Sequence, residues 1–217
     1  MSDRGRLVAW LAFVAVYAAL NYGARFSGEG PDRSVLYTYS AAVFGLLQLG
    51  IILGLMLLIT LNRPKREYFA LRRPVSWPRA VSLGVLVLIG VFVVGGILEP
   101  FLHPGHEQGI VPEKWQPEHA AAFAFNFVVV ALLAPVVEEL TFRGLGYRLL
   151  QRFGQVAAIL LVGLLFGLAH GLVEALPILA AFGAGLAYLR ARTRSVYPGM
   201  LVHAGFNSLV LVLAVAI

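Results

Sequence analysis

The sequence predicts an all-α protein, a polytopic bundle of about seven helices that spans a membrane. Three observations lead to this fold class. Hydrophobic residues make up 59% of the 217-residue chain and charged residues only 13%, which is about half the charged fraction of soluble domains. The apolar residues gather in seven long runs, and charged and turn-forming residues lie between them. Each run approaches the ~20 residues that a helix needs to cross ~30 Å of hydrocarbon.

The expected membrane helices follow one another along the whole chain, so we expect a single integral membrane domain over residues 1–217. The seven runs are Leu7–Tyr22, Leu36–Leu61, Ala80–Leu98, Ala120–Phe142, Gln155–Gly171, Leu176–Leu189 and Tyr197–Ile217. The first run follows two arginines, as in a signal peptide, but no small-x-small cleavage site follows it, which favours a retained helix. The chain has no cysteine, which excludes disulfides, thiolate zinc sites and a cysteine nucleophile.

The distribution of basic residues predicts the orientation in the membrane. The net charge is +6, but the basic residues lie between apolar runs, so topology explains the charge and no nucleic-acid partner is expected. Of the 17 Lys and Arg residues, only Arg25, Arg33 and Lys114 fall in loops on one side of the predicted bundle. Because basic loops remain inside, we expect a cytoplasmic N-terminus.

Two adjacent carboxylates, Glu138 and Glu139, follow one of the most apolar runs in the chain. Within 120–137 the only strongly polar side chain is Asn126. A carboxylate in hydrocarbon costs roughly 2.5–3.5 kcal/mol, so each glutamate needs a partner inside the protein. Adjacent helical residues point about 100° apart, and Glu139 precedes Arg143 by the spacing of an intrahelical ion pair. We therefore expect Glu139 to pair with Arg143 and Glu138 to project into a cavity.

His170 is predicted to lie level with Glu138 across a helical hairpin. If the fourth and fifth helices turn at residues 153–154, both side chains are roughly 22–24 Å from the turn at ~1.5 Å per residue. Gly163 and Gly167 would let these two helices approach closely. The alternative is that His170 is a hydrogen-bonded structural group near a helix end.

His203 and Asn207 are four residues apart and therefore share one face of the last helix. A polar pair within an apolar span is expected to face the bundle interior. Such a pair can also serve only to hydrogen-bond one helix to another, and this alternative stays open. Likewise, the Glu139–Arg143 pair alone could be an interfacial ion pair that ends a membrane helix.

The loop of residues 100–119, which is expected on the outer side of the membrane, contains a sequence that resembles a zinc site only in part. His106 and Glu107 begin like the zincin signature, but Ile110 stands where the second histidine is required. Together with His103, these residues are expected to form a solvated loop.

Three motifs stand in order on successive apolar runs. They are Glu-Glu-x-x-x-Arg at 138–143, Phe-x-x-x-His at 166–170 and His-x-x-x-Asn at 203–207. Together they resemble the CPBP family, the CAAX prenyl endopeptidases and bacteriocin-processing proteins, also called the Abi family, with a motif region at about 119–210. The resemblance implies an intramembrane endopeptidase that acts near the cytoplasmic membrane face. The functional set that it implies is Glu138, Glu139, Arg143, His170, His203 and Asn207.

Peptide hydrolysis needs an activated water molecule and a stabilised oxyanion. Our hypothesis is that Glu138 and His170 activate water, while His203 and Asn207 donate hydrogen bonds to the oxyanion. The rival hypothesis is a zinc ion on Glu138, His170 and His203, since two histidines and one carboxylate leave a position for water. The sequence leaves open whether the protein needs zinc or no cofactor.

The resemblance also implies a peptide or protein substrate, which in the eukaryotic branch of the family carries a lipidated C-terminal tail. The expected location is the plasma membrane of a prokaryote, with the lipid bilayer as a further partner. Two other functions stay open, a catalytically idle immunity or scaffold protein and a proton-coupled transporter, because intramembrane ionisable residues serve those roles too. A transporter predicts half-helices or an internal repeat, and no repeat is found.

Overall fold

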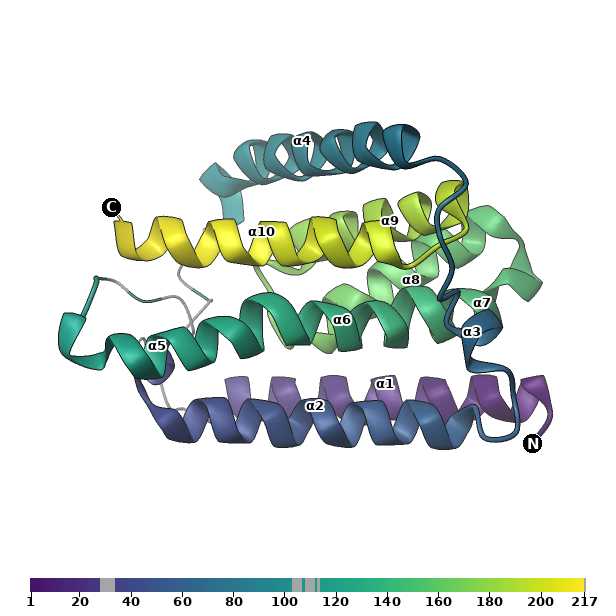
Figure 1. Cartoon of the computed structure of the whole chain (residues 1–217), viewed down its shortest axis with the longest axis horizontal. Helices are drawn as coiled ribbons and strands as arrows, with labels where there is room; N and C mark the ends of the chain where they lie inside the picture. Colours follow the sequence, from purple (N-terminus) through teal and green to yellow (C-terminus); the bar gives the residue numbers. More distant parts are fainter. Residues whose placement is uncertain (28–33, 103–106, 108–111, 113, 217) are drawn as a thin grey trace.

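The computed structural model describes residues 1–27, 34–102, 107, 112 and 114–216. These residues form a bundle of helices without any strand, which confirms the predicted all-α class (Figure 1). Within the described chain, five helical segments are long and apolar enough to cross a membrane. They are α1 (Asp3–Arg25), α2 (Tyr39–Ile59), α4 (Trp77–Leu102), the continuous segment Pro117–Phe153 and α10 (Tyr197–Ala216). Two further helices complete the bundle, α8 (Gln155–Ala169) and α9 (Leu176–Thr193).

The fourth predicted helix extends beyond its apolar run to the turn that the sequence predicted at residues 153–154. It continues beyond Phe142 to Phe153 and forms a single 37-residue segment, which we call the central rod. Its successive parts are η3 (Pro117–His119), α5 (Ala120–Phe127), η4 (Val128–Leu133), α6 (Ala134–Glu138), η5 (Glu139–Gly146), α7 (Tyr147–Leu150) and η6 (Gln151–Phe153). Two of these parts, η4 and η5, are π-helical. Such wide turns are rare and occur frequently at functional sites, and here they flank the short α-helical part that ends at Glu138.

Proline and side-chain hydrogen bonds explain how the rod tolerates its wide turns. Pro135 has no N–H to donate. In a π-helix, the acceptor of that N–H would be the carbonyl five residues earlier, which belongs to Val130. The Asn207 side-chain nitrogen of α10 donates to that carbonyl at 3.1 Å. Further along, the Thr141 hydroxyl donates to the Val137 carbonyl at 2.8 Å. Side chains thus satisfy carbonyl groups that hydrocarbon could not.

The central rod separates two groups of helices. Figure 1 shows α1 and α2 together on one side of the rod, with α10 and α9 on the other and α4 beyond them. The N-terminal helix packs tightly against η5. The Trp10 indole N–H donates to the Thr141 carbonyl at 3.0 Å, and a Cβ on Gly146 would lie 2.2 Å from the Trp10 ring. A Cβ on Gly144 would lie 3.0 Å from Phe69, so both glycines provide room for neighbouring aromatic rings.

The chain turns where the sequence predicted, but the helix that approaches α8 most closely is α9. Gly154 adopts a positive φ of 96° at the turn between the rod and α8. A Cβ on Gly163 would lie 2.6 Å from the Ala184 backbone nitrogen, and one on Gly167 would lie 3.0 Å from that of Ala180. The expectation that these glycines face the fourth helix is therefore wrong, because the small-residue face of α8 is covered by α9.

Two shorter elements lie in the connections between the membrane helices. η1 (Val35–Tyr37) precedes α2, and α3 (Lys65–Tyr68) lies in the basic loop that follows it. This loop packs against the α9–α10 connection. The Val75 backbone nitrogen donates to the Thr193 carbonyl at 3.2 Å, and the Val196 nitrogen donates to the Ala70 carbonyl at 3.3 Å.

The outer loop differs from its prediction at Glu107. The Glu107 side chain is buried, and its carboxylate accepts the three backbone N–H groups of residues 173–175 at 2.7–3.1 Å. The Arg25 guanidinium lies 3.0 Å from the same carboxylate. The expectation of a solvated loop is therefore wrong at this residue, because Glu107 links the end of α1 to the start of α9. His103 and His106 lie outside the described residues.

Candidate active site

The predicted Glu139–Arg143 ion pair is present and sealed from solvent. The Arg143 Nη1 lies 3.0 Å from the Glu139 Oε1, and both side chains are 0% exposed. The Arg143 Nη2 also donates to the Gly183 carbonyl of α9 at 3.2 Å. The guanidinium carbon lies 4.2 Å from the centre of the Phe166 ring. Arg143 therefore connects the central rod with α8 and α9 through contacts of three kinds.

His203 of α10 lies between the two adjacent glutamates. Its Nδ1 is 3.3 Å from the Glu139 Oε1, and its Nε2 is 3.7 Å from the Glu138 Oε2. The His203 side chain is only 4% exposed, and the rings of Phe166 and Phe182 lie 5.7 and 5.2 Å away, edge to face. Since the Glu139 carboxylate can only accept, Nδ1 donates to it and Nε2 faces Glu138.

Gly199 provides the space in which the Glu139 carboxylate fits. A Cβ added at this position would lie 2.3 Å from the Glu139 Oε2, which is closer than any side chain tolerates. The role of Gly199 was not predicted from the sequence. A glycine in the first turn of α10, next to Pro198, gave no sign of its contact with a carboxylate some sixty residues earlier in the chain.

His170 has its proton-bearing nitrogen fixed by the backbone. The Nδ1 lies 2.7 Å from the Phe166 carbonyl. Because a carbonyl oxygen only accepts, the Nδ1 must carry the hydrogen, and the neutral ring keeps its lone pair on Nε2. The residue directly follows α8, and its ring stacks edge to face on Phe166 at 4.5 Å. His170 is thus oriented to accept a proton on Nε2.

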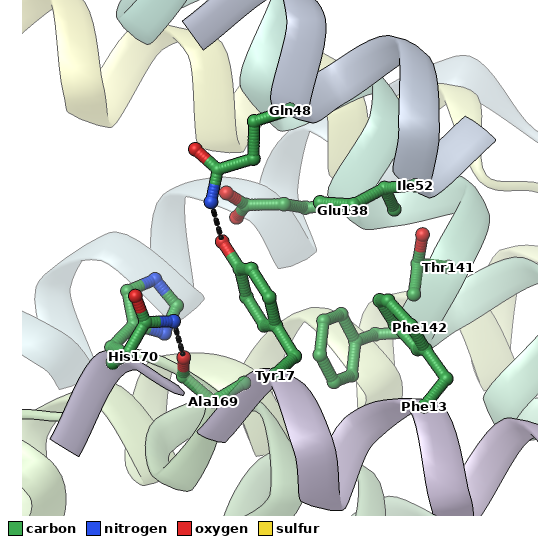
Figure 2. Close-up of a pocket in the computed structure, with 10 residues that line it drawn as sticks. Phe13, Tyr17, Gln48, Ile52, Glu138, Thr141, Phe142, Ala169 and His170 are labelled. Carbon is green, nitrogen blue, oxygen red and sulfur yellow. Dashed lines mark hydrogen bonds between the residues drawn. The ribbon is translucent and has the colours of Figure 1, made fainter. Parts of the chain in front are cut away.

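Glu138 and His170 line two cavities, one on each side of the central rod. The first, with a volume of about 330 Å³, also contains His203 and Asn207, and we call it the apolar cavity because most of its lining is hydrophobic. The second, about 210 Å³, contains Tyr17, Asn21 and Gln48 from α1 and α2, and we call it the polar chamber (Figure 2). Glu138 is 24% exposed, which distinguishes it from its sealed neighbour.

The structure therefore brings four of the six predicted residues to one cavity and places the other two directly behind it. Glu138, His170, His203 and Asn207 line the apolar cavity, and Glu139 and Arg143 are buried beside it. Asn207 uses a side-chain N–H to bond the Val130 carbonyl. An amide nitrogen carries two hydrogens, so the second remains for the predicted oxyanion role.

The residues proposed as zinc ligands do not form a preassembled metal centre in this structure. Among the described residues, no group of three or more His, Asp or Glu side chains is placed to hold a metal ion. The Nδ1 atoms of His170 and His203 each hydrogen-bond a protein oxygen atom, which leaves Nε2 as the nitrogen of each ring that could bind a metal ion. The Nε2 of His203 faces Glu138 at 3.7 Å, so these groups interact with one another.

The first two helices contribute to the site, which was not predicted from the sequence. Beyond its first two residues, α2 has only one strongly polar side chain, Gln48, and this side chain lines the polar chamber. Tyr17 and Asn21 are four residues apart on one face of α1 and line the same chamber. Asn21 and Gln48 are isolated amides within apolar runs, and this isolation is the signal in the sequence that could have identified them.

Comparison with known proteins supports the predicted family. Residues 120–209 match the family model described as Rce1-like, type II CAAX prenyl endopeptidase Rce1-like. The match covers the central rod, α8, α9 and the first part of α10, and it confirms the resemblance drawn from the three motifs. The long apolar helices indicate an integral membrane protein, and residues 120–209, less than half of the chain, are similar to CAAX-type proteases. No curated protein and no solved structure gives a significant match to the chain.

Proposed function

From the Rce1-like match of residues 120–209, we propose that this chain is an intramembrane endopeptidase in which Glu138 and His170 activate the hydrolytic water. One observation carries the proposal. A carboxylate that is partly exposed and an imidazole with a free Nε2 line the same cavity, within a bundle that is otherwise largely apolar.

The cleavage step uses the groups on the cavity wall. Glu138 removes a proton from water as the water oxygen bonds to the scissile carbonyl carbon, and the carbonyl π electrons move to its oxygen. The resulting tetrahedral oxyanion collapses, the carbon–nitrogen bond breaks, and the proton passes from Glu138 to the leaving amine. His170 accepts a hydrogen bond from the attacking water on Nε2 and thereby orients it. No step requires a metal ion.

The oxyanion is stabilised from α10. His203 and Asn207 lie on the face of α10 that lines the apolar cavity, and Asn207 keeps one amide hydrogen beyond its bond to Val130. His203 donates from Nε2 in its doubly protonated form, because its Nδ1 hydrogen is donated to Glu139. Donors that are already oriented stabilise developing charge strongly in a site of low dielectric constant. The sealed Glu139–Arg143 pair keeps His203 in place through Nδ1.

The substrate is a peptide or protein segment, and a lipidated C-terminal tail suits the apolar cavity best. Apart from Glu107, the cavity walls away from the reacting groups are hydrophobic. They include Val130, Leu179, Phe206, Val210 and Leu211. An apolar lining of this kind favours an alkyl or prenyl chain over a charged side chain. The reaction takes place near the cytoplasmic face in a prokaryotic plasma membrane, with the N-terminus of the chain inside.

The proposal is tested with purified protein in lipid nanodiscs and a quenched fluorescent peptide that ends in a farnesylated Cys-a-a-X sequence. We expect the wild-type protein to cleave the peptide and Glu138→Gln to abolish cleavage. Equal cleavage by both proteins, or none by the wild type, would contradict the proposal. A chelator-treated, metal-free sample is expected to retain activity, and loss of activity restored by zinc would overturn the metal-free mechanism.

The natural substrate can be found by comparing peptide ends in two membrane preparations. Cells that express the wild-type protein should contain new C-termini that cells with Glu138→Gln lack. The matched control is Tyr39→Phe, since Tyr39 is exposed and lies outside both cavities. Cells with this variant should reproduce the wild-type pattern.

A further inference from the structure

One wall of the polar chamber comes from helices that lie outside the family match. α1 provides Tyr17 and Asn21, and α2 provides Gln48. Glu138 and His170 close the chamber from the side of the rod and α8 (Figure 2). The apolar cavity on the other side of the same two residues is lined mainly by α9 and α10. Glu138 and His170 therefore separate a polar compartment from an apolar one.

The polar side chains of the chamber are positioned by specific hydrogen bonds. The Gln48 Nε2 donates to the Tyr17 hydroxyl oxygen at 2.9 Å. The Asn21 Nδ2 donates to the Ala169 carbonyl at 2.8 Å, next to His170. An amide within an apolar span is unfavourable unless it has a partner or a function. These side chains are therefore more than incidental polar residues on lipid-facing helices.

We infer that the polar chamber holds the hydrolytic water and that Tyr17, itself oriented by Gln48, is a positioning residue for that water. This inference rests on the proposed peptidase function and adds the N-terminal helices to it. The substrate then approaches Glu138 from the apolar cavity and the water from the polar chamber.

The hydrogen-bond directions support this role for Tyr17. Its oxygen accepts from Gln48, so its own hydrogen remains to be donated to another group. Figure 2 shows the Tyr17 hydroxyl beside the Glu138 carboxylate and the Gln48 amide. The chamber volume of about 210 Å³ accommodates several water molecules, each of which occupies about 30 Å³ in the liquid. A water that accepts from Tyr17 can donate its hydrogens to Glu138 and His170.

The division into two compartments answers a chemical requirement of hydrolysis inside a membrane. An apolar substrate that fills its cavity displaces water from it, yet the reaction needs a water molecule at the scissile carbonyl. A separate polar compartment keeps that water in place while the substrate is bound.

The first experiment measures kcat and KM for the farnesylated fluorescent peptide. We expect Tyr17→Phe to lower kcat by about two- to tenfold, as for loss of a hydrogen bond between neutral groups, with little change in KM. Gln48→Leu should lower kcat in the same direction. The double variant should be no slower than Tyr17→Phe alone, because Gln48 acts through Tyr17. Tyr39→Phe is the matched control and should behave like the wild type.

The second experiment detects water in the chamber without measuring activity. The chain has no native cysteine, so single cysteines report on one position each. We expect Gln48→Cys in vesicles to react with a charged, water-soluble methanethiosulfonate at least about ten times faster than Leu47→Cys, because only a hydrated thiol ionises. Leu47 is the matched control, since it is exposed on the same helix but outside the chamber.

The outcomes separate this inference from the proposed function. If Glu138→Gln is inactive while Tyr17→Phe has the wild-type kcat, the water-positioning role is wrong and the peptidase assignment stands. Equal labelling at positions 47 and 48 would also overturn the inference. If Glu138→Gln cleaves normally, the proposed function itself fails, and the inference fails with it.

Discussion

Glu138 and Glu139 are identical in type and adjacent in sequence, yet they occupy opposite environments. Glu139 is completely buried, paired with Arg143 and His203, and packed against the Cα of Gly199. Glu138 is 24% exposed, lies between two cavities and has the Nε2 of His203 at 3.7 Å. The difference follows from the angle of about 100° between adjacent helical residues. One carboxylate maintains the architecture, while the other is available for chemistry.

The largest effect expected from this comparison concerns Glu138. Glu138→Gln preserves size but removes the base, and we expect the cleavage rate to fall by about 10²–10⁴-fold. The thermal midpoint in detergent should change little, because the side chain is partly exposed and has no ion pair with arginine. A large loss of stability in this variant would show that Glu138 too is structural, and the comparison would break down.

The second prediction concerns Glu139. Glu139→Gln leaves the buried Arg143 without its counter-charge, and removal of one partner of a buried pair typically costs about 3–5 kcal/mol. We expect a marked fall in the thermal unfolding midpoint. The double variant Glu139→Met with Arg143→Met should recover part of the loss, since no unpaired charge remains. If the single variant melted like the wild type, the pair would have no structural role.

The third prediction concerns the space that Glu139 occupies. In Gly199→Ala the new methyl group would overlap the Glu139 carboxylate, and the required displacement should cost about 1–3 kcal/mol. Gly205→Ala on the same helix is the control, because a Cβ there has no neighbour within 4 Å. Measured by thermal unfolding, Gly205→Ala should match the wild type or exceed it. Equal stability of the two variants would argue against a tight fit at Gly199.

The smallest effect is expected at Glu107, a third carboxylate, which lies outside the membrane helices. Burial opposes its ionisation, but the backbone N–H groups of residues 173–175 and the Arg25 guanidinium outweigh burial. Its pKa therefore lies below the ordinary value of 4.5. A carboxyl group whose pKa is lowered by folding stabilises the folded chain above its unfolded pKa, and this contribution is lost as the pH falls through the folded value.

Glu107→Gln should consequently lower the unfolding midpoint at neutral pH by an amount equivalent to about 1–2 kcal/mol. The difference from the wild type should shrink as the pH falls below the ordinary value of 4.5 and Glu107 becomes protonated. The measurement is the midpoint of both proteins at each pH. A difference that stays constant down to the lowest pH would contradict the assigned ionisation.

Local patterns in the sequence predicted most of the fold and part of the site. Runs of apolar residues located the membrane helices, and the four-residue spacing predicted the Glu139–Arg143 pair, because both depend only on helix geometry. The turn that ends the central rod at residues 153–154 was predicted, but the π-helical geometry of the charged and glycine-rich segment from 138 to 146 was not. In the structure that segment is buried by neighbouring aromatic rings and continues as a π-helix.

The remaining parts of the site depend on contacts between distant segments. Gly199 matters because it meets a carboxylate on another helix, and Gln48 matters because it bonds a tyrosine on α1. Glu107 lies in a sequence that lacks the second histidine of a zinc signature. Its carboxylate instead accepts hydrogen bonds from the backbone N–H groups just before α9. A single sequence does not state which helices are neighbours, so these roles could not be read from spacing alone.

The shortness of α8 has a consequence for the surrounding lipid. Its 15 residues span about 22 Å, against about 30 Å of hydrocarbon in a typical bilayer. The imidazole of His170 follows its last turn, at the end of the helix that is distant from Gly154. Lipid beside α8 must thin to match the helix, as expected for hydrophobic mismatch, and turnover should therefore depend on acyl-chain length in the host bilayer.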